Sequence, residues 1–229
     1  MTDFVIEVGE TPSLPVIGRR DRFPVHRIYC LGRNYAAHAP EMGKDPEKEA
    51  PFFFLKPADA IVPEGGEVHY PPGTSNLHYE IELVVALHRG GFQIPAARAL
   101  DHVYGYAVGL DMTRRDLQLQ ARDMGRPWDF GKAFDESAPI TAIHPVASQG
   151  HHSAGAISLT VNGELRQKAD LQDMIWNIPD TLAFLSNYYH LRAGDLIFTG
   201  TPAGVGAVVR GDKLVGHVEG LAELRVTIA

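Results

Sequence analysis

The hydrophobic residues of this chain fall into many short runs, and glycine and proline separate one run from the next. Residues 222–229 alternate apolar and polar positions, as a half-exposed strand does. Asn162 and Gly163 predict the two-residue turn of a β-hairpin within 157–167. Longer apolar runs, typical of buried strands, lie within residues 26–32, 52–57, 76–85, 102–113 and 193–206.

Helical spacing is confined to a few segments. Residues 113–125 are predicted to form a helix, because Thr113 and Asp116 have the spacing of a capping box and Gly125 suits the C-terminal stop. Residues 178–191 are also predicted to form a helix, because Pro179 suits a first turn and the apolar side chains that follow fall close to helical spacing. Strands dominate and do not alternate regularly with helices. The pattern therefore predicts a β-rich α+β fold rather than a doubly wound sheet.

Composition limits the class of protein. The chain has 229 residues and 45% hydrophobic content, which predicts a single domain over 1–229, with 1–25 as a short N-terminal extension packed on it. The single cysteine, Cys30, forms no intrachain disulfide, so we expect a cytoplasmic protein. The net charge of −7 and the lack of a basic tract argue against nucleic acid as a partner. No apolar run is long enough to cross a membrane, and the N-terminus lacks the features of a signal peptide.

Two carboxylates interrupt the apolar run 76–85. Residues two apart in a strand point to the same face, so Glu80 and Glu82 face one way while Ile81 and Leu83 face the other. Two carboxylates about 6 Å apart repel by roughly 3 kcal/mol at an effective dielectric constant near 20. The pair therefore indicates either a strand face that is open to water or a site that holds a cation.

A third carboxylate, Asp111, ends the apolar run 102–113, and its neighbours give it no surface character. Three carboxylates with no cysteine or histidine among them form a hard oxygen donor set that suits Mg²⁺ or Mn²⁺. The spacing alone supports a metal site and a solvated strand face about equally.

Seven segments then occur in a fixed order: YCLGRNYAAH, FFFLKP, NLHYEIELVV, GLDMTRRDLQ, RPWDFGKAFD, VNGELRQ and IFTGTPAGVG. Together they resemble the fumarylacetoacetate hydrolase family, in its short acylpyruvate-hydrolase branch. The resemblance runs from about Arg27 to the C-terminus. Within the branch, the first two segments look most like the fumarylpyruvate hydrolases of gentisate degradation.

The resemblance implies a mixed β-sheet roll, usually as a homodimer, with a divalent metal that is typically Mg²⁺. It implies that Glu80, Glu82 and Asp111 are the metal ligands. It also implies three catalytic residues, which are the dyad of His38 and Glu41 and the lysine Lys132. A histidine with a pKa near 6.5 suits the activation of water, and a carboxylate three residues later on a helix would orient it.

The expected substrate is a 2,4-dioxo acid, whose carboxylate and 2-oxo oxygens would chelate the metal. The candidate substrate-binding residues are Arg33, Lys56, Arg115, Gln118 and Thr201. For most of them, a salt bridge or a surface contact is an equally good interpretation. If the substrate carries a second carboxylate at its far end, Arg33, Arg114 or Lys56 would bind it, and the sequence does not choose among them.

Several functions remain open. The first is hydrolysis of the carbon–carbon bond of a 2,4-dioxo acid, with fumarylpyruvate as the leading substrate and acetylpyruvate or another acylpyruvate as alternatives. The same site would also serve decarboxylation of oxaloacetate or isomerisation of a dienedioate. A non-catalytic protein that binds a metal or an oxo acid, and a plain structural β-domain, are hypotheses of a different class.

Overall fold

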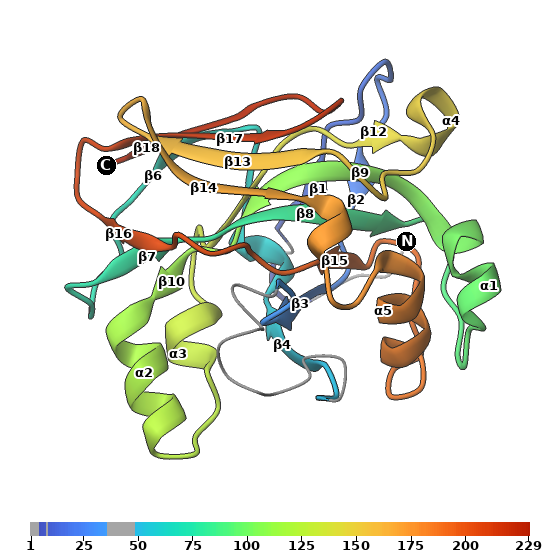
Figure 1. Cartoon of the computed structure of the whole chain (residues 1–229), viewed down its shortest axis with the longest axis horizontal. Coiled ribbons are helices and arrows are strands. Elements are labelled where there is room, and N and C mark those ends of the chain that lie inside the picture. The colour runs from blue at the N-terminus through green and yellow to red at the C-terminus, as the bar shows by residue number, and fades with distance from the viewer. Residues whose placement is uncertain (1–4, 8, 36–48) are drawn as a thin grey trace.

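The computed structural model describes residues 5–7, 9–35 and 49–229, which form a strand-rich body with short helices at its periphery (Figure 1). The larger sheet is mixed, because β3–β15 and β11–β5 are parallel pairs and its other pairs are antiparallel. Its strands are, in spatial order, β4 (Phe52–Lys56), β3 (Ile28–Gly32), β15 (Leu196–Phe198), β8 (Ile81–Leu87), β9 (Val103–Leu110), β11 (Ala138–Ile140) and β5 (Ile61–Pro63), with β12 (His144–Pro145) paired to β9.

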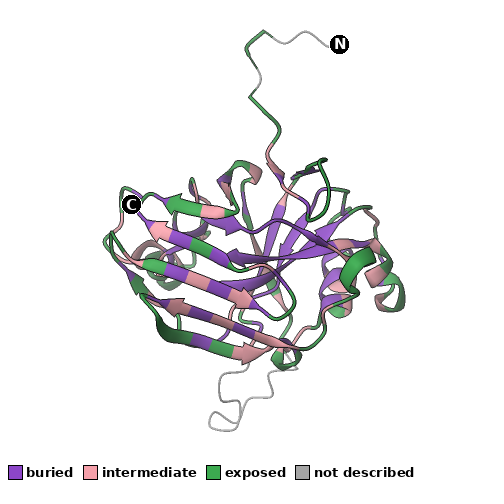
Figure 2. Cartoon of the chain, turned by 90° about the horizontal axis from the view of Figure 1, so that it is seen from above, coloured by how far each residue is buried: buried purple, intermediate pink, exposed green. Residues whose placement is uncertain are grey.

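A second sheet packs against the larger one and has solvent on its other side. Residues of β17 and β18 alternate between buried and more exposed, whereas β8 is buried at every position (Figure 2). The alternation predicted for 222–229 is therefore confirmed. The strands of this sheet are, in spatial order, β14 (Glu164–Asp170), β13 (Ala156–Val161), β17 (Lys213–Val218), β18 (Leu224–Ile228) and β6 (Gly65–Val68).

Strand β8 contributes to a hydrophobic core on each of its faces. Ile81 and Leu83 pack in the core between the two sheets, where Ile157 is also buried. Val84 lies on the opposite face, in a second core that the N-terminal segment helps to close. That segment forms the small sheet β1 (Ser13–Leu14) and β2 (Phe23–Pro24). Burial on both faces explains why the run 76–85 is so apolar.

A small sheet of β10 (Thr113–Arg114), β7 (Leu77–Tyr79) and β16 (Gly206–Val208) continues from one end of the larger sheet. The run 76–85 is consequently two strands rather than one. The chain leaves β7 at Tyr79 and enters β8 at Ile81, so Glu80 lies at the junction.

The helix predicted over 113–125 begins later than expected. Helix α2 spans Arg115–Asp123, and the proposed capping box is wrong. The hydroxyl of Thr113 donates to the backbone carbonyl of Asp111 at 3.1 Å, and the Asp116 carboxylate accepts from Thr74 at 2.6 Å. The predicted stop is confirmed, because Gly125 has φ 62° and the N–H groups of residues 125 and 126 bond back to the last turn.

The hairpin is confirmed, and the second helix forms where expected but ends at Leu185 rather than near residue 191. Asn162 and Gly163 have φ values of 53° and 84°, as a type I′ turn requires. Helix α5 (Ile178–Leu185) is capped by the Asn177 side chain. The other helical segments are α1 (Ala96–Ala99), α3 (Asp129–Lys132), α4 (Val146–Gln149), η3 (Ala58–Ala60), η4 (Leu100–His102) and η5 (Leu171–Asp173). In the described ranges, none of the helices has the length and apolar character that a membrane crossing needs.

Candidate active site

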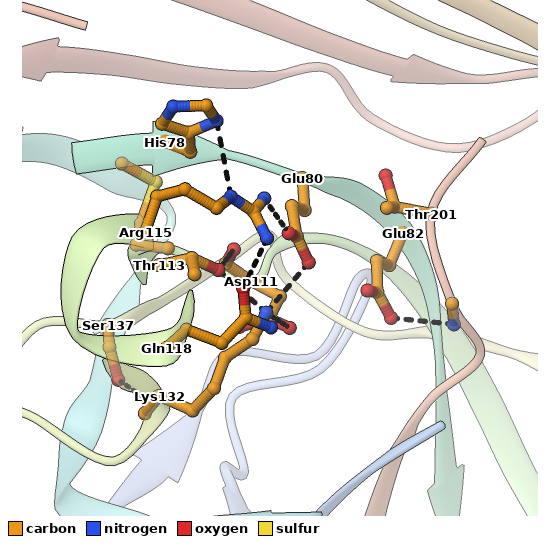
Figure 3. Close-up of polar contacts among 12 residues, drawn as sticks. His78, Glu80, Glu82, Asp111, Thr113, Arg115, Gln118, Lys132, Ser137 and Thr201 are labelled. Carbon is orange, nitrogen blue, oxygen red and sulfur yellow. Dashed lines mark hydrogen bonds and ion pairs between the residues drawn. The ribbon is translucent and has the colours of Figure 1, made fainter. Parts of the chain in front are cut away.

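Three buried carboxylates meet where the larger sheet joins the small one. Glu80 lies between β7 and β8, Glu82 lies in β8, and Asp111 follows the neighbouring antiparallel strand β9. The backbone N–H of Asp111 donates to the carbonyl of Glu80 at 2.9 Å, which fixes the register of the two strands at this point. Oxygen atoms of the three side chains lie within 4.8 Å of one another. We call Glu80, Glu82 and Asp111 the acidic triad (Figure 3).

Lys132, at the end of α3, is buried against two members of the acidic triad. Its Nζ donates to Glu80 Oε2 at 2.8 Å, to Asp111 Oδ2 at 2.6 Å and to the Thr113 hydroxyl at 2.6 Å (Figure 3). These bonds use all three hydrogens of the ammonium group. Burial opposes the charge, but the two carboxylates outweigh it and raise the pKa of Lys132. Lys132 is therefore a fixed cation and not a surface lysine.

A second lysine, Lys56, forms an ion pair with the other carboxylate oxygen of Asp111. Its Nζ lies 2.9 Å from Asp111 Oδ1 and donates to the carbonyls of Met112 and Lys132. Its ammonium is thus fully engaged, and it does not line the cavity described below. The substrate-binding role predicted for Lys56 does not fit this position. Burial raises the pKa of Asp111, but Lys132 and Lys56 more than offset that effect, and the net result is a lowered pKa.

Glu82 lacks such cationic support among the described residues. It accepts a hydrogen bond from the backbone N–H of Gly200 at 2.7 Å. Gly200 has φ 93°, and a Cβ there would lie 2.6 Å from that of Asn34, so glycine is required for this approach. Burial, followed by the charges of Asp111 and Glu80, raises the pKa of Glu82 well above its ordinary value.

This donor set fits a divalent metal. The oxygens are close together and buried, and Glu82 has a carboxylate whose charge the neighbouring cations do not balance. A cation held by Glu80, Glu82 and Asp111 would supply the missing positive charge. Among the described residues this cluster has no sulfur or nitrogen ligand, which favours a hard ion such as Mg²⁺ or Mn²⁺.

Arg115, in the first turn of α2, is a third cation that contacts the acidic triad. Its guanidinium forms an ion pair with Glu80 and donates to Gln118 Oε1 at 2.5 Å. His78 Nδ1 accepts from Arg115 Nε at 3.4 Å, while Nε2 pairs with Asn76 Oδ1 at 2.9 Å. Burial, with the nearby charges of Arg115 and Lys132, lowers the pKa of His78 to about 4. A neutral His78 thus orients Arg115, a role that its sequence position did not indicate.

The acidic triad opens into a cavity of about 440 Å³. Of the predicted site residues, the cavity lining includes the triad, Lys132, Arg33, Arg115, Gln118 and Thr201. Gln167 Nε2 donates to Thr201 Oγ1 at 2.8 Å, so the Thr201 hydroxyl hydrogen remains available to an acceptor in the cavity. Arg114 is directed elsewhere, with its guanidinium 4.4 Å from the centre of the Phe134 ring. His38 and Glu41 lie outside the described residues.

Comparison with known proteins identifies the family. Residues 27–229 match the model of the fumarylacetoacetate (FAA) hydrolase C-terminal domain. The chain belongs to the fumarylacetoacetate hydrolase family. The expected family and its mixed, strand-rich fold are thereby confirmed.

Individual members of the family are similar over most of their length. A fumarylpyruvate hydrolase of a Ralstonia species is 51% identical over 189 residues, which cover 82% of this chain and 98% of the relative. The crystal structure of fumarylpyruvate hydrolase from Pseudomonas aeruginosa in complex with Mn²⁺ and pyruvate is 54% identical, with a TM-score of 0.94 and 99% of each chain covered. A mitochondrial oxaloacetate tautomerase of Rattus norvegicus is 43% identical over 201 residues, covering 88% of this chain and 90% of the relative.

Proposed function

We propose that this protein uses a divalent metal to hydrolyse a carbon–carbon bond of a 2,4-dioxo acid, and that its substrate is fumarylpyruvate. The observation that carries the proposal is the buried acidic triad, which lines the cavity together with the fixed cation Lys132. The names of two similar proteins, fumarylpyruvate hydrolases at 51% and 54% identity, support the choice of substrate.

The charges around the triad suit such a substrate. The acidic triad and its neighbours Lys56, Lys132 and Arg115 carry three charges of each sign in total, although these cations contact Glu80 and Asp111 and leave Glu82 without a contact. A bound divalent metal then gives the site a charge of about two positive units. The pyruvyl end of a dioxo acid brings a carboxylate and, as the bond breaks, an enolate oxygen, which together carry two negative charges. The site is therefore best balanced when the reaction has reached the enolate.

The reaction needs water to add to the 4-oxo carbon. The C3–C4 bond then breaks, and the new carboxylate becomes part of fumarate. The electron pair of the bond passes to the pyruvate half as an enolate, which takes up a proton at C3 to give pyruvate. A divalent metal held by Glu80, Glu82 and Asp111 would act as a Lewis acid for the developing oxyanion. We assign the binding of the substrate carboxylate to Arg115 and the Thr201 hydroxyl, which both line the cavity, and the positioning of Glu80 and Asp111 to the hydrogen bonds of Lys132.

Activation of the water is assigned to His38, with Glu41 orienting its ring. This assignment rests on the resemblance of the segment 29–38 to the family and on the ability of histidine to accept a proton near neutral pH. Both roles stay predictions from the sequence.

Further details of the proposal are Mg²⁺ as the metal in the cell, a homodimer, a cytoplasmic location and a place in gentisate degradation. The homodimer is supported by β4, which lies at the edge of the larger sheet with Phe52 and Leu55 exposed. An apolar edge strand is a surface that proteins normally cover.

A panel of substrates tests the proposed function. Fumarylpyruvate, acetylpyruvate, maleylpyruvate and oxaloacetate are supplied separately to the Mg²⁺-loaded protein, and pyruvate is measured. We expect fumarylpyruvate to have the highest kcat/KM. Turnover of oxaloacetate alone would show that hydrolysis is not the reaction.

Oxaloacetate tautomerisation is a second candidate, favoured by the 43% identity to the mitochondrial tautomerase. It would use the same stabilisation of an enolate and would need no water. Enol-to-keto conversion of oxaloacetate, followed by ultraviolet absorbance, separates it from hydrolysis because no carbon–carbon bond breaks and no pyruvate forms.

A further inference from the structure

One face of helix α2 runs along the cavity. Arg115, Gln118, Leu119 and Arg122 line the cavity, and their spacing of three, four and seven residues places them on one side of the helix. Seven residues of helix rise about 10 Å. Arg115 is held at the acidic triad, so Arg122 lies two turns further along the helix, where its side chain is exposed.

The cations that line this cavity fall into two groups. Lys132 and Arg115 are engaged by the acidic triad, whereas Arg122 and Arg33 are exposed. Arg122 pairs with its chain neighbour Asp123, and both side chains of this pair are largely open to water. Such an exposed pair is weak, since solvent screens it, so its guanidinium can exchange Asp123 for another carboxylate.

We propose that Arg122 binds the distal carboxylate of the substrate and thereby selects dioxo diacids over acylpyruvates with an apolar tail. The inference rests on the proposed function, which assigns the 2-oxo acid end of the substrate to the acidic triad. A seven-carbon diacid contains six carbon–carbon bonds of about 1.5 Å, so an extended chain from the triad reaches the second turn of α2. The guanidinium fork matches a carboxylate in two parallel hydrogen bonds.

The position of Arg122 distinguishes it from the other candidate cations. Lys56 is paired with Asp111, Arg114 is stacked on Phe134, and neither residue lines the cavity. Arg33 also lines the cavity, but it belongs to the loop after β3, and its guanidinium lies 6.0 Å from the centre of the Phe52 ring. Among the described cations that line the cavity, Arg122 alone shares a regular element with Arg115, so the helix sets the separation of these two residues.

A pair of matched ligands tests the proposal without turnover. 2-Oxoheptanedioate and 2-oxoheptanoate have the same 2-oxo acid end and the same chain length, and they differ only in the terminal carboxylate. Calorimetry of the Mg²⁺-loaded protein is expected to give at least a tenfold lower Kd for the diacid. The Arg122→Gln variant should lose that preference, while its Kd for 2-oxoheptanoate stays within about twofold of the wild type.

Control variants make the result specific. Arg126→Gln removes an exposed arginine just beyond the same helix that does not line the cavity, and it should keep the preference for the diacid. Arg122→Lys should keep part of it. Equal affinities of the wild type for the two ligands, or an unchanged preference in Arg122→Gln, would overturn the proposal. Loss of preference in Arg33→Gln alone would also overturn it, because the distal carboxylate would then bind Arg33.

Turnover separates this inference from the proposed function. If the wild type hydrolyses neither fumarylpyruvate nor acetylpyruvate, the proposed function fails, while the two Kd values still decide the role of Arg122. If both are hydrolysed, Arg122→Gln should lower kcat/KM at least tenfold for fumarylpyruvate, mainly through KM, and less than twofold for acetylpyruvate.

Discussion

Lys132 Nζ lies 2.6 Å from Asp111 Oδ2, and both side chains are almost completely buried. A buried ion pair of this kind costs desolvation energy, so it contributes stability only while both partners are present. The same ammonium also bonds to Glu80, which means that one cation separates two members of the acidic triad. We therefore expect metal binding and folding to be coupled at this point.

Replacing Lys132 by Met should destabilise the metal-free protein by about 3–5 kcal/mol, because two buried carboxylates lose their shared cation. Added Mg²⁺ should restore part of that loss. Thermal unfolding in EDTA and in Mg²⁺ measures both effects. The exposed Lys168→Met is the control, and a variant as stable as the wild type in EDTA would contradict the account.

Replacing Glu82 by Gln should have the opposite effect on stability. Burial and two neighbouring carboxylates raise the pKa of Glu82, so removing its charge relieves repulsion in the metal-free protein. The same change removes a ligand, and Mg²⁺ affinity should fall by at least about tenfold, or 1.4 kcal/mol. Calorimetry measures the Mg²⁺ affinity, and unfolding in EDTA measures the stability of the metal-free protein. The exposed Glu67→Gln is the control. Unchanged Mg²⁺ affinity would exclude Glu82 as a ligand.

Thr201→Val should leave Mg²⁺ affinity unchanged and reduce kcat/KM for fumarylpyruvate by about 10- to 100-fold, as expected for one hydrogen bond to a charged acceptor. Gln167 already donates to the Thr201 oxygen, so the hydroxyl hydrogen is the part that the substrate uses. Thr201→Ser keeps this hydrogen and should recover most of the activity. Equal kinetics for the Val and Ser variants would show that the hydroxyl has no such role.

The pattern of two carboxylates two residues apart and a third after the next strand left a metal site and a solvated strand face equally open, and the resemblance to the family assigned Glu80, Glu82 and Asp111 as ligands. The partners of Lys132 were not predictable, since they depend on where the short helix α3 packs. Thr113 was misassigned as a cap for a related reason. Its hydroxyl receives a hydrogen bond from Lys132, a contact between residues 19 positions apart.

The positions of Arg122 and Lys56 were likewise not predictable from the sequence. Arg122 is seven residues after Arg115, a spacing that becomes informative only once the cavity-facing side of α2 is known. Lys56 ends the apolar strand β4, and its sequence context does not reveal that its ammonium is covered by Asp111 and two carbonyls. Burial of a charged group is decided by tertiary packing, which short segments do not encode.

A pH effect on stability is expected away from the cavity. His144 Nε2 accepts the backbone N–H of Ala222 at 3.0 Å, which requires an unprotonated nitrogen. Burial, and then the neighbouring His152, lower the pKa of His144 below its ordinary value of 6.5. Below pH 6.5 the unfolded chain therefore binds more protons than the folded one, so the free energy of unfolding falls as the pH decreases towards the pKa of the folded state.

His144→Gln tests this effect, because its amide oxygen still accepts the Ala222 N–H but does not titrate. We expect the Tm of the wild type to decrease further than the Tm of the variant between pH 7.5 and pH 5.5. Parallel decreases in the two proteins would assign the acid sensitivity to other groups.

Pyruvate release from fumarylpyruvate by metal-stripped protein, followed as Mg²⁺ is added, tests the central claim most directly. The acidic triad predicts no release in EDTA and a saturable increase with Mg²⁺ in the wild type. In Glu82→Gln the increase should require at least about tenfold more Mg²⁺, in line with its weaker binding. Equal release with EDTA and with Mg²⁺ would contradict the account.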